Sequence, residues 1–276
     1  LMSVYNCENF VSEAIYSVLN QTYVNFELII IDDGSTDKTK DIIKNFSDKR
    51  IRLIQNKENL GLPRSLNIGL KVAQGKYIAR LDADDICSPD RLLLQLNYLK
   101  EHPNVGVLGT DVEFIDKVGN KFKSAKRLKK IKSHNPISYF FNLQKPKSHN
   151  VCVWYLLFRN CFYHPTVMFK KSIVINVGGY ENKKSEDLDL WSRLFDKTNF
   201  TNLKIPLLSH RIHSGQMTSE TRSKELDIRI EARKRVFSTI FTENTNLDFI
   251  RLLSLRSNKS GDQLKSSLIF LDQTYI

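Results

Sequence analysis

The first hundred residues alternate between strand patterns and helix patterns, and this alternation limits the chain to few folds. The predicted strands are residues 1–4, 26–32, 51–55 and 77–81. The predicted helices are residues 10–21, 37–46, 62–73 and 88–102. The second strand is an almost unbroken apolar run, which is typical of strands that a parallel sheet buries on both faces. Regular alternation of this kind indicates an α/β fold with an open, mostly parallel sheet flanked by helices.

The pattern changes after residue 104. Residues 105–114 predict one more long strand, and the apolar run Val151–Phe158 is predicted to belong to the core. Apolar residues near helical spacing from Glu220 onward predict a helical tail. We therefore divide the chain into residues 1–104, residues 105–215 of the same domain, and a helical C-terminal extension at residues 216–276.

The net charge of +12 is unevenly distributed. Residues 1–120 hold 14 Lys and Arg against 17 Asp and Glu, whereas residues 121–276 hold 28 against 13. The basic second part includes the segment Lys121–Lys132. Such asymmetry suggests an anionic partner, which could be a membrane surface, a phosphorylated acceptor or nucleic acid, and a solvated basic face is the alternative.

Two composition features bear on location. No apolar stretch approaches the roughly 18 residues of a membrane-spanning helix. The four cysteines form no C-x-x-C pair, which argues against zinc and for reduced thiols in the cytoplasm.

Acidic turns follow two of the predicted strands, at Asp32–Asp37 and at Asp82–Asp85. Because the carboxyl ends of parallel strands meet at one edge of the sheet, both turns are expected there. Clustered carboxylates repel one another, and a hard divalent cation such as Mn²⁺ or Mg²⁺ would offset that repulsion. The alternative is that the aspartates only shape turns and cap helices. No glycine-rich phosphate loop follows the first strand, so bound phosphates would rest on metal and arginine.

A third acidic group, Glu186 and Asp187, begins a predicted helix behind Ser185. Ser185 is predicted to cap this helix, and acids in its first turn suit the helix dipole. The functional alternative is that one carboxylate faces the cleft as a general base.

Taken in order, these and further motifs resemble the family 2 glycosyltransferases of the GT-A fold over about residues 1–215. The matching pieces are Met2–Asn6, Ser17–Tyr23, Asp32–Asp37, Asn59–Gly61, Arg64–Gly69, Gly75–Ala79, Leu81–Asp85, His164–Met168, Val177–Tyr180, Glu186–Asp187 and Arg211–His213. Each motif is weak alone, but their joint order and spacing are highly specific.

The resemblance implies an inverting hexosyl- or N-acetylhexosaminyl-transferase that uses a nucleotide-diphosphate sugar. UDP is the commonest donor nucleotide of the family. The acceptor would be a hydroxyl of a polysaccharide or of a lipid-linked glycan. Residues 1–104 would form the half that binds the nucleotide sugar, and residues 105–215 the half that holds the acceptor and the base.

The resemblance also implies residue roles. Tyr5 would stack on the nucleotide base, Asp33 would bond to base or ribose, and Arg64 would lie near the phosphates. Asp82 and Asp84 fill the D-x-D positions, so Asp82 would contact ribose or reach the metal through water.

Asp84 would be the direct metal ligand, His213 would lie near the metal and diphosphate, and Asp187 would be the catalytic base. Further candidates are Asp32, Glu186 and His164, the last with no assigned role and a packed, hydrogen-bonded histidine as the default.

Two other classes stay open. A sugar-nucleotide nucleotidyltransferase would need a glycine-rich basic loop after the first strand, which Asn6–Asn9 does not supply. A non-catalytic nucleic-acid-binding module would interleave aromatics with the basic run, where only Phe122 interrupts Lys121–Lys132, so no nucleic acid is expected. We expect a cytoplasmic protein, with peripheral contact to the inner face of an anionic membrane as a hypothesis from charge.

Overall fold

The strands form two sheets, and Arg80 separates residues 77–79, which pair in one sheet, from residues 81–82, which pair in the other. A computed structural model of the chain describes residues 1–122, 145–213 and 226–240. Its strands are β1 (Met2–Val4), β2 (Leu28–Asp32), β3 (Ile51–Gln55), β4 (Tyr77–Ala79), β5 (Leu81–Asp82), β6 (Ile86–Cys87), β7 (Val105–Ile115), β8 (Met168–Lys170) and β9 (Asn199–Arg211). Its helices are α1 (Val11–Leu19), α2 (Thr39–Lys44), α3 (Leu62–Val72), α4 (Arg91–Glu101), α7 (His149–Phe158), the 3-10 helix η1 (His164–Thr166), α8 (Lys171–Asn176), α9 (Glu186–Leu194) and α10 (Leu226–Ile240).

The first sheet has the order β3-β2-β1-β5, and its three strand pairs are all parallel. All five residues of β2 are buried, because α1 and α2 cover one face of this sheet and α3 covers the other. Ile30 packs in the core beneath α1, whereas Ile29 and Ile31 pack beneath α3. The alternation of strands and helices therefore correctly predicted a doubly covered parallel sheet.

The second sheet has the order β4-β8-β7-β9-β6 and is mixed. The long strands β7 and β9 run parallel, and the other three pairs are antiparallel. Helix α4 packs on one face through Leu96 and Leu99. The other face carries the largest core cluster, in which Phe162 and Phe200 surround the fully buried Trp191 of α9.

Two predicted elements differ from the structure. The single predicted strand 77–81 is split at Arg80, because the Arg80 N–H bonds to Val167 and the Leu81 N–H bonds to Leu1. The fourth helix begins at Arg91 instead of residue 88, because the Ser88 N–H pairs with Leu207 of β9.

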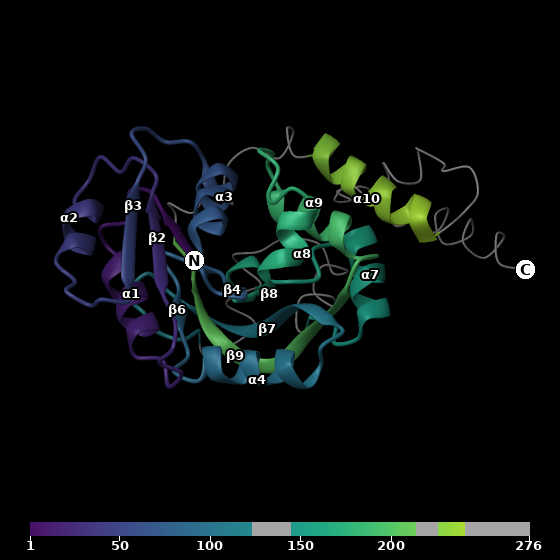
Figure 1. Cartoon of the computed structure of the whole chain (residues 1–276), viewed down its shortest axis with the longest axis horizontal. Coiled ribbons are helices and arrows are strands. Elements are labelled where there is room, and N and C mark those ends of the chain that lie inside the picture. Colours follow the sequence, from purple (N-terminus) through teal and green to yellow (C-terminus); the bar gives the residue numbers. More distant parts are fainter. Residues whose placement is uncertain (123–144, 214–225, 241–276) are drawn as a thin grey trace, which may run out of the picture.

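The second half contains two helices that matter for the site. Val151–Phe158 lies in α7, whose Cys152, Val153, Leu156 and Leu157 are buried in the core, whereas Val151, Trp154 and Phe158 are exposed, so the core prediction holds for one face of the run only. Of the predicted helical tail the structure describes only α10, which lies beside α9 and α7 (Figure 1), and the rest of residues 216–276 lies outside the described residues. None of the helices in the described ranges combines the length and the apolar character needed to cross a bilayer. Most of the basic segment Lys121–Lys132 lies outside the described residues.

Candidate active site

The loops after β1 and β2 are joined at the carboxyl edge of the parallel sheet. Asn6 has a positive φ of 47°, and its side-chain oxygen accepts a hydrogen bond of 2.8 Å from the Thr36 N–H. Tyr5 directly precedes it, and 46% of this residue is exposed beyond the end of β1. An exposed aromatic ring at this edge is available to stack on a planar ligand.

Asp33 is almost completely buried and serves first to hold the loop that precedes α3. Its two carboxylate oxygens accept hydrogen bonds from the Asn56 amide at 2.7 Å, the Leu60 N–H at 3.0 Å and the Gly61 N–H at 2.9 Å. Three donors therefore already bond to this carboxylate. A contact of Asp33 with base or ribose stays a prediction. Asp32 is likewise buried and accepts bonds from the Ser35 N–H and the Gln55 amide.

Arg64 lies on the first turn of α3 and its side chain is exposed. The helix starts behind Gly61, whose φ of 88° is in the region that favours glycine. The loop anchored by Asp33 therefore sets where α3 begins and, with it, where Arg64 stands.

Three carboxylates gather in the second acidic turn. Asp82, Asp84 and Asp85 each offer an oxygen, and these oxygens lie within 4.8 Å of one another. Asp84 is partly exposed, and its Oδ2 lies 3.0 Å from His213 Nε2. Asp82 forms an ion pair of 2.5 Å with the buried Arg80. Burial acts to raise the pKa of Asp82, but the Arg80 guanidinium outweighs it and holds the pKa below its usual value.

Asp85 supports this turn from behind. It is fully buried, accepts a bond of 2.9 Å from the Arg211 N–H and lies 3.1 Å from His210 Nδ1. Burial raises the pKa of Asp85 to about 6, against the opposing effect of His210. Because its oxygens are occupied by these donors, Asp85 shapes the turn and is a poor ligand.

Arg211 fixes the same turn to the rest of the molecule. Its guanidinium donates to the Asp84 carbonyl at 2.8 Å and to Glu13 on α1 at 2.5 Å. Phe10 packs against both the Arg211 guanidinium and the His213 ring. Strand β9 thus brings His213 to Asp84 across 129 residues of sequence.

The donor set of Asp84 and His213 fits a hard divalent cation. A carboxylate oxygen and an imidazole nitrogen stand side by side, both partly accessible, with the Asp82 carboxylate close by. Ions such as Mn²⁺ and Mg²⁺ bind to carboxylates and keep further positions for phosphate oxygens and water.

The predicted base, Asp187, lies in the first turn of α9. Its Oδ1 accepts a bond of 2.7 Å from the Leu188 N–H, and its Oδ2 accepts a bond from the side-chain amide of Asn160. Burial raises the pKa of Asp187, and the charge of Glu186 raises it further, against smaller opposing effects of His164 and Leu188. A carboxylate with a raised pKa is a better proton acceptor than an ordinary one.

The prediction that the Ser185 side chain caps α9 is wrong. Ser185 does precede the helix, but it is in the left-handed region with φ of 57°, and its side chain makes no capping bond. In that conformation the hydroxyl does not reach the first free N–H groups of the helix.

Sequence reasoning missed Arg80 and Asn160. Arg80 is 2% exposed and bonds Asp82, and its charge also influences Asp187, His164 and Tyr180. An arginine inside an apolar strand pattern was a usable signal, because a buried guanidinium needs a partner. Asn160 carried no such signal, since asparagine before a turn is common.

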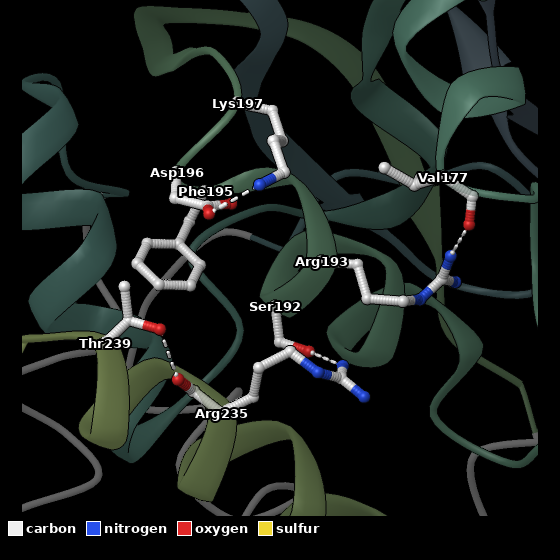
Figure 2. Close-up of a pocket in the computed structure, with 8 residues that line it drawn as sticks. All are labelled: Val177, Ser192, Arg193, Phe195, Asp196, Lys197, Arg235 and Thr239. Atoms are coloured by element: carbon white, nitrogen blue, oxygen red, sulfur yellow. Dashed lines mark hydrogen bonds and ion pairs between the residues drawn. The ribbon is translucent and has the colours of Figure 1, made fainter.

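A cavity of the described residues lies elsewhere, between α9 and α10 (Figure 2). It measures about 310 Å³ and includes Arg193, Lys197 and Arg235 in its lining. These cations face carboxylates, because Arg193 and Arg235 both bond Asp189 and Lys197 bonds Asp196. This cavity therefore lies at the packing interface between α9 and α10.

Solved structures share the fold. The S. aureus TarS fragment 1–349 in complex with UDP-GlcNAc has a TM-score of 0.68 at 20% identity, covering 96% of this chain and 74% of that one. The mannosyltransferase PcManGT from Pyrobaculum calidifontis in complex with GDP-Man and Mn²⁺ has a TM-score of 0.57 at 16% identity, covering 91% and 66%. The fold is the GT-A fold of glycosyltransferases.

Sequence comparisons place the chain more narrowly. The model of the family described as glycosyl transferase family 2 matches residues 1–167. An uncharacterized glycosyltransferase of Haemophilus influenzae is 31% identical over 97% of this chain and 83% of its own length. The O-antigen biosynthesis glycosyltransferase WbnJ of Escherichia coli is 33% identical over 78% of this chain and 79% of its own length. The chain belongs to glycosyl transferase family 2 and is a glycosyltransferase. The comparisons support neither of the two alternatives, a nucleotidyltransferase or a nucleic-acid-binding module.

Proposed function

We propose that the protein transfers a sugar from a nucleotide-diphosphate sugar to an acceptor hydroxyl in one inverting displacement. The observation that carries this proposal is the grouping of Asp84 with Asp82, whose oxygens lie within 4.8 Å of each other, and with His213, whose Nε2 lies 3.0 Å from Asp84 Oδ2. The grouping lies at the carboxyl edge of a parallel sheet, where open α/β proteins bind their ligands.

The donor is held by the first half of the chain, residues 1–104. Tyr5 stacks on the base, Asp33 contacts base or ribose, Arg64 lies by the phosphates, and Asp82 lies by the ribose. Solved neighbours support a nucleotide-sugar donor, since TarS was crystallised with UDP-GlcNAc and PcManGT with GDP-Man. We propose UDP as the nucleotide, with a hexose or an N-acetylhexosamine as the sugar.

Asp84 and His213 would hold a Mn²⁺ or Mg²⁺ ion. The PcManGT complex contains Mn²⁺, which supports such a site in this fold. When bound, the ion supplies positive charge for the oxygens of the leaving diphosphate. Arg64 adds a fixed positive charge from α3.

Residues 105–215 supply the other side of the reaction. Asp187, oriented by Asn160, accepts the proton of the attacking hydroxyl. The acceptor oxygen forms a bond to the anomeric carbon, the bond from that carbon to the diphosphate breaks, and its electron pair leaves with the nucleoside diphosphate. Attack from the face opposite the leaving group inverts the anomeric centre.

The acceptor is a polysaccharide or a lipid-linked glycan, handled in the cytoplasm at the inner face of the membrane. The name of the relative WbnJ, an O-antigen biosynthesis glycosyltransferase, supports a surface glycan. The excess of 28 Lys and Arg over 13 Asp and Glu in residues 121–276 supports contact with anionic lipid.

Liposome binding tests the membrane part of this proposal. Neutralising Lys126, Arg127, Lys129, Lys130 and Lys132 should abolish sedimentation with vesicles that contain anionic lipid. These residues lie outside the described ranges, so the expectation rests on charge alone. Neutralising Lys38, Lys40, Lys44 and Lys49 of the first half is the control, and equal binding by all three proteins would refute the lipid contact.

Release of nucleoside diphosphate from UDP-, GDP- and dTDP-sugars tests the reaction itself. We expect turnover of one donor that requires Mn²⁺ or Mg²⁺ and that falls by about 10²–10⁴-fold in Asp84→Ala and in Asp187→Asn. Turnover that persists in both variants would refute the assigned roles.

A further inference from the structure

His164 is buried in the interior beside the first turn of α9. It begins η1, and 8% of the residue is exposed. Its Nε2 lies 3.1 Å from the hydroxyl of Tyr180, and its Nδ1 lies 3.4 Å from Oε1 of Glu186. Both ring nitrogens are therefore engaged by groups of known polarity, which allows the ring's protonation state to be worked out.

The ring is neutral and carries its proton on Nδ1. Burial, with repulsion from Arg80, lowers the pKa of His164 to about 3. The ionised carboxylate of Glu186 can only accept, so Nδ1 carries the ring proton. A neutral imidazole has one donor and one acceptor, and Nε2 is left to accept from the Tyr180 hydroxyl, whose pKa burial raises far above its usual range.

Tyr180 is in turn fixed to the helix that carries Arg64. The side-chain amide of Asn67 on α3 accepts from the Tyr180 N–H at 2.9 Å and donates to the Tyr180 carbonyl at 2.6 Å. The preceding Gly179 has φ of 76°, and a Cβ there would come within 2.5 Å of Asn67 Oδ1. The chain of contacts runs from Asn67 through Tyr180 and His164 to Glu186.

The first turn of α9 is held by contacts from outside the helix. Ser185 makes no side-chain capping bond, and the contact of His164 with Glu186 is one of those that hold this turn. Glu186 is the first residue of α9 and Asp187 the second. A contact that holds Glu186 therefore also restrains the backbone that carries Asp187, whose carboxylate oxygens accept from Asn160 and from the Leu188 N–H.

We propose that His164 is a positioning residue for the transfer reaction, joining Tyr180 to Glu186 and thereby fixing Asp187 relative to α3 and the bound donor. The proposal rests on the proposed function, in which Asp187 is the base. The 3.4 Å separation between His164 Nδ1 and Glu186 Oε1 is the longer of the two contacts that the ring makes.

The first test separates turnover from donor binding. Asn carries an amide N–H near the position of Nδ1, whereas Gln carries its amide near Nε2. We expect His164→Gln to lower kcat by about 10–10²-fold with the KM for the donor within about twofold. His164→Asn should recover most of that loss, and exposed His102→Asn is the matched control.

A double-mutant cycle tests whether His164 acts on the reaction through Glu186. If His164 acts through Glu186, then His164→Gln combined with Glu186→Gln should be no slower than the slower single variant. If the losses of kcat in the two single variants multiply in the double variant, or if the His164→Gln enzyme has normal kcat, the proposal is overturned while the transferase reaction stays established. Calorimetric binding of UDP by each variant confirms that it is folded, and a wild type that turns over no donor would overturn both proposals.

The tautomer gives a test that needs no turnover. In ¹⁵N NMR of the full chain, the His164 ring should show a protonated Nδ1 and an unprotonated Nε2 near neutral pH, with His164→Asn used for assignment. A ring protonated on Nε2, or on both nitrogens, would overturn the proposed arrangement.

Discussion

The side-chain amide of Asn160 donates a hydrogen bond to Oδ2 of Asp187, from a position 27 residues earlier in the chain. The other oxygen of Asp187 accepts from the Leu188 N–H at 2.7 Å, so both oxygens have a fixed donor. Asn160 is itself held, because its side-chain oxygen accepts a bond of 3.1 Å from the Phe162 N–H. Phe162 packs edge to face on Trp191 of α9, with ring centroids 5.2 Å apart. The carboxylate proposed as base is thus oriented from both sides.

Asn160→Ala should lower kcat by about 10–10²-fold, which is the value of one hydrogen bond to a charged group. The KM for the donor should stay within about twofold, because Asn160 contacts the base and not the donor-binding half. Initial rates at varied donor and acceptor concentrations measure the split. Asn150→Ala, at an exposed position on α7, is the control, and an Asn160→Ala enzyme with wild-type kcat would show that the bond does not serve the base.

The rate should depend on pH through Asp187. A base acts in its deprotonated form, so activity is lost as the pH falls through the pKa of that carboxyl. Because burial raises this pKa, the acid limb of kcat/KM for the acceptor should lie above the value of about 4 expected of an ordinary aspartate. A pH–rate profile measures the limb. A limb at or below pH 4 would mean either that the pKa is not raised or that another group is the base.

The two arginines that bond Asp189 on α9 should contribute unequally to the free energy of unfolding. Asp189 is 2% exposed and is bonded by Arg193 at 2.8 Å and by Arg235 of α10 at 3.3 Å. Figure 2 shows these two arginines. Arg193 also donates to the Val177 and Gly179 carbonyls, and it is the more buried of the two.

Arg193→Ala should therefore lower the free energy of unfolding by about 2–4 kcal/mol, and Arg235→Ala by about 1 kcal/mol. Urea unfolding of both variants measures the difference. An equal or larger loss in Arg235→Ala would show that α10 contributes more to the second half than these contacts indicate.

The parallel sheet could be predicted from sequence because its pattern is local. Residues 28–31 of β2 are apolar throughout and the helices between the strands are amphipathic, so length and periodicity suffice. The second sheet is different. Strand β9 runs from Asn199 to Arg211 through exposed residues and Pro206, and it is held by β7, from a segment almost one hundred residues earlier. Tertiary pairing of that kind leaves little local signal.

The candidate site divides in the same way. Asp84 and Asp187 could be named from the chemistry of clustered acids together with the family resemblance. Asn160 could not, because its importance lies in a contact with Asp187, which is 27 residues away in the chain. Asp33 shows the converse. Its carboxylate accepts hydrogen bonds from three backbone and side-chain donors and so holds the loop before α3, a structural role that its motif does not reveal.

The most direct test of the account is turnover of nucleotide sugars by the wild type beside Asp84→Ala and Asp187→Asn, with and without Mn²⁺. Asp41→Ala, at an exposed position on α2, is the matched control. The account predicts that one donor is turned over with metal, that each active-site variant is slower by about 10²–10⁴-fold, and that the control equals wild type. Turnover that survives both substitutions, or that needs no metal, would contradict it.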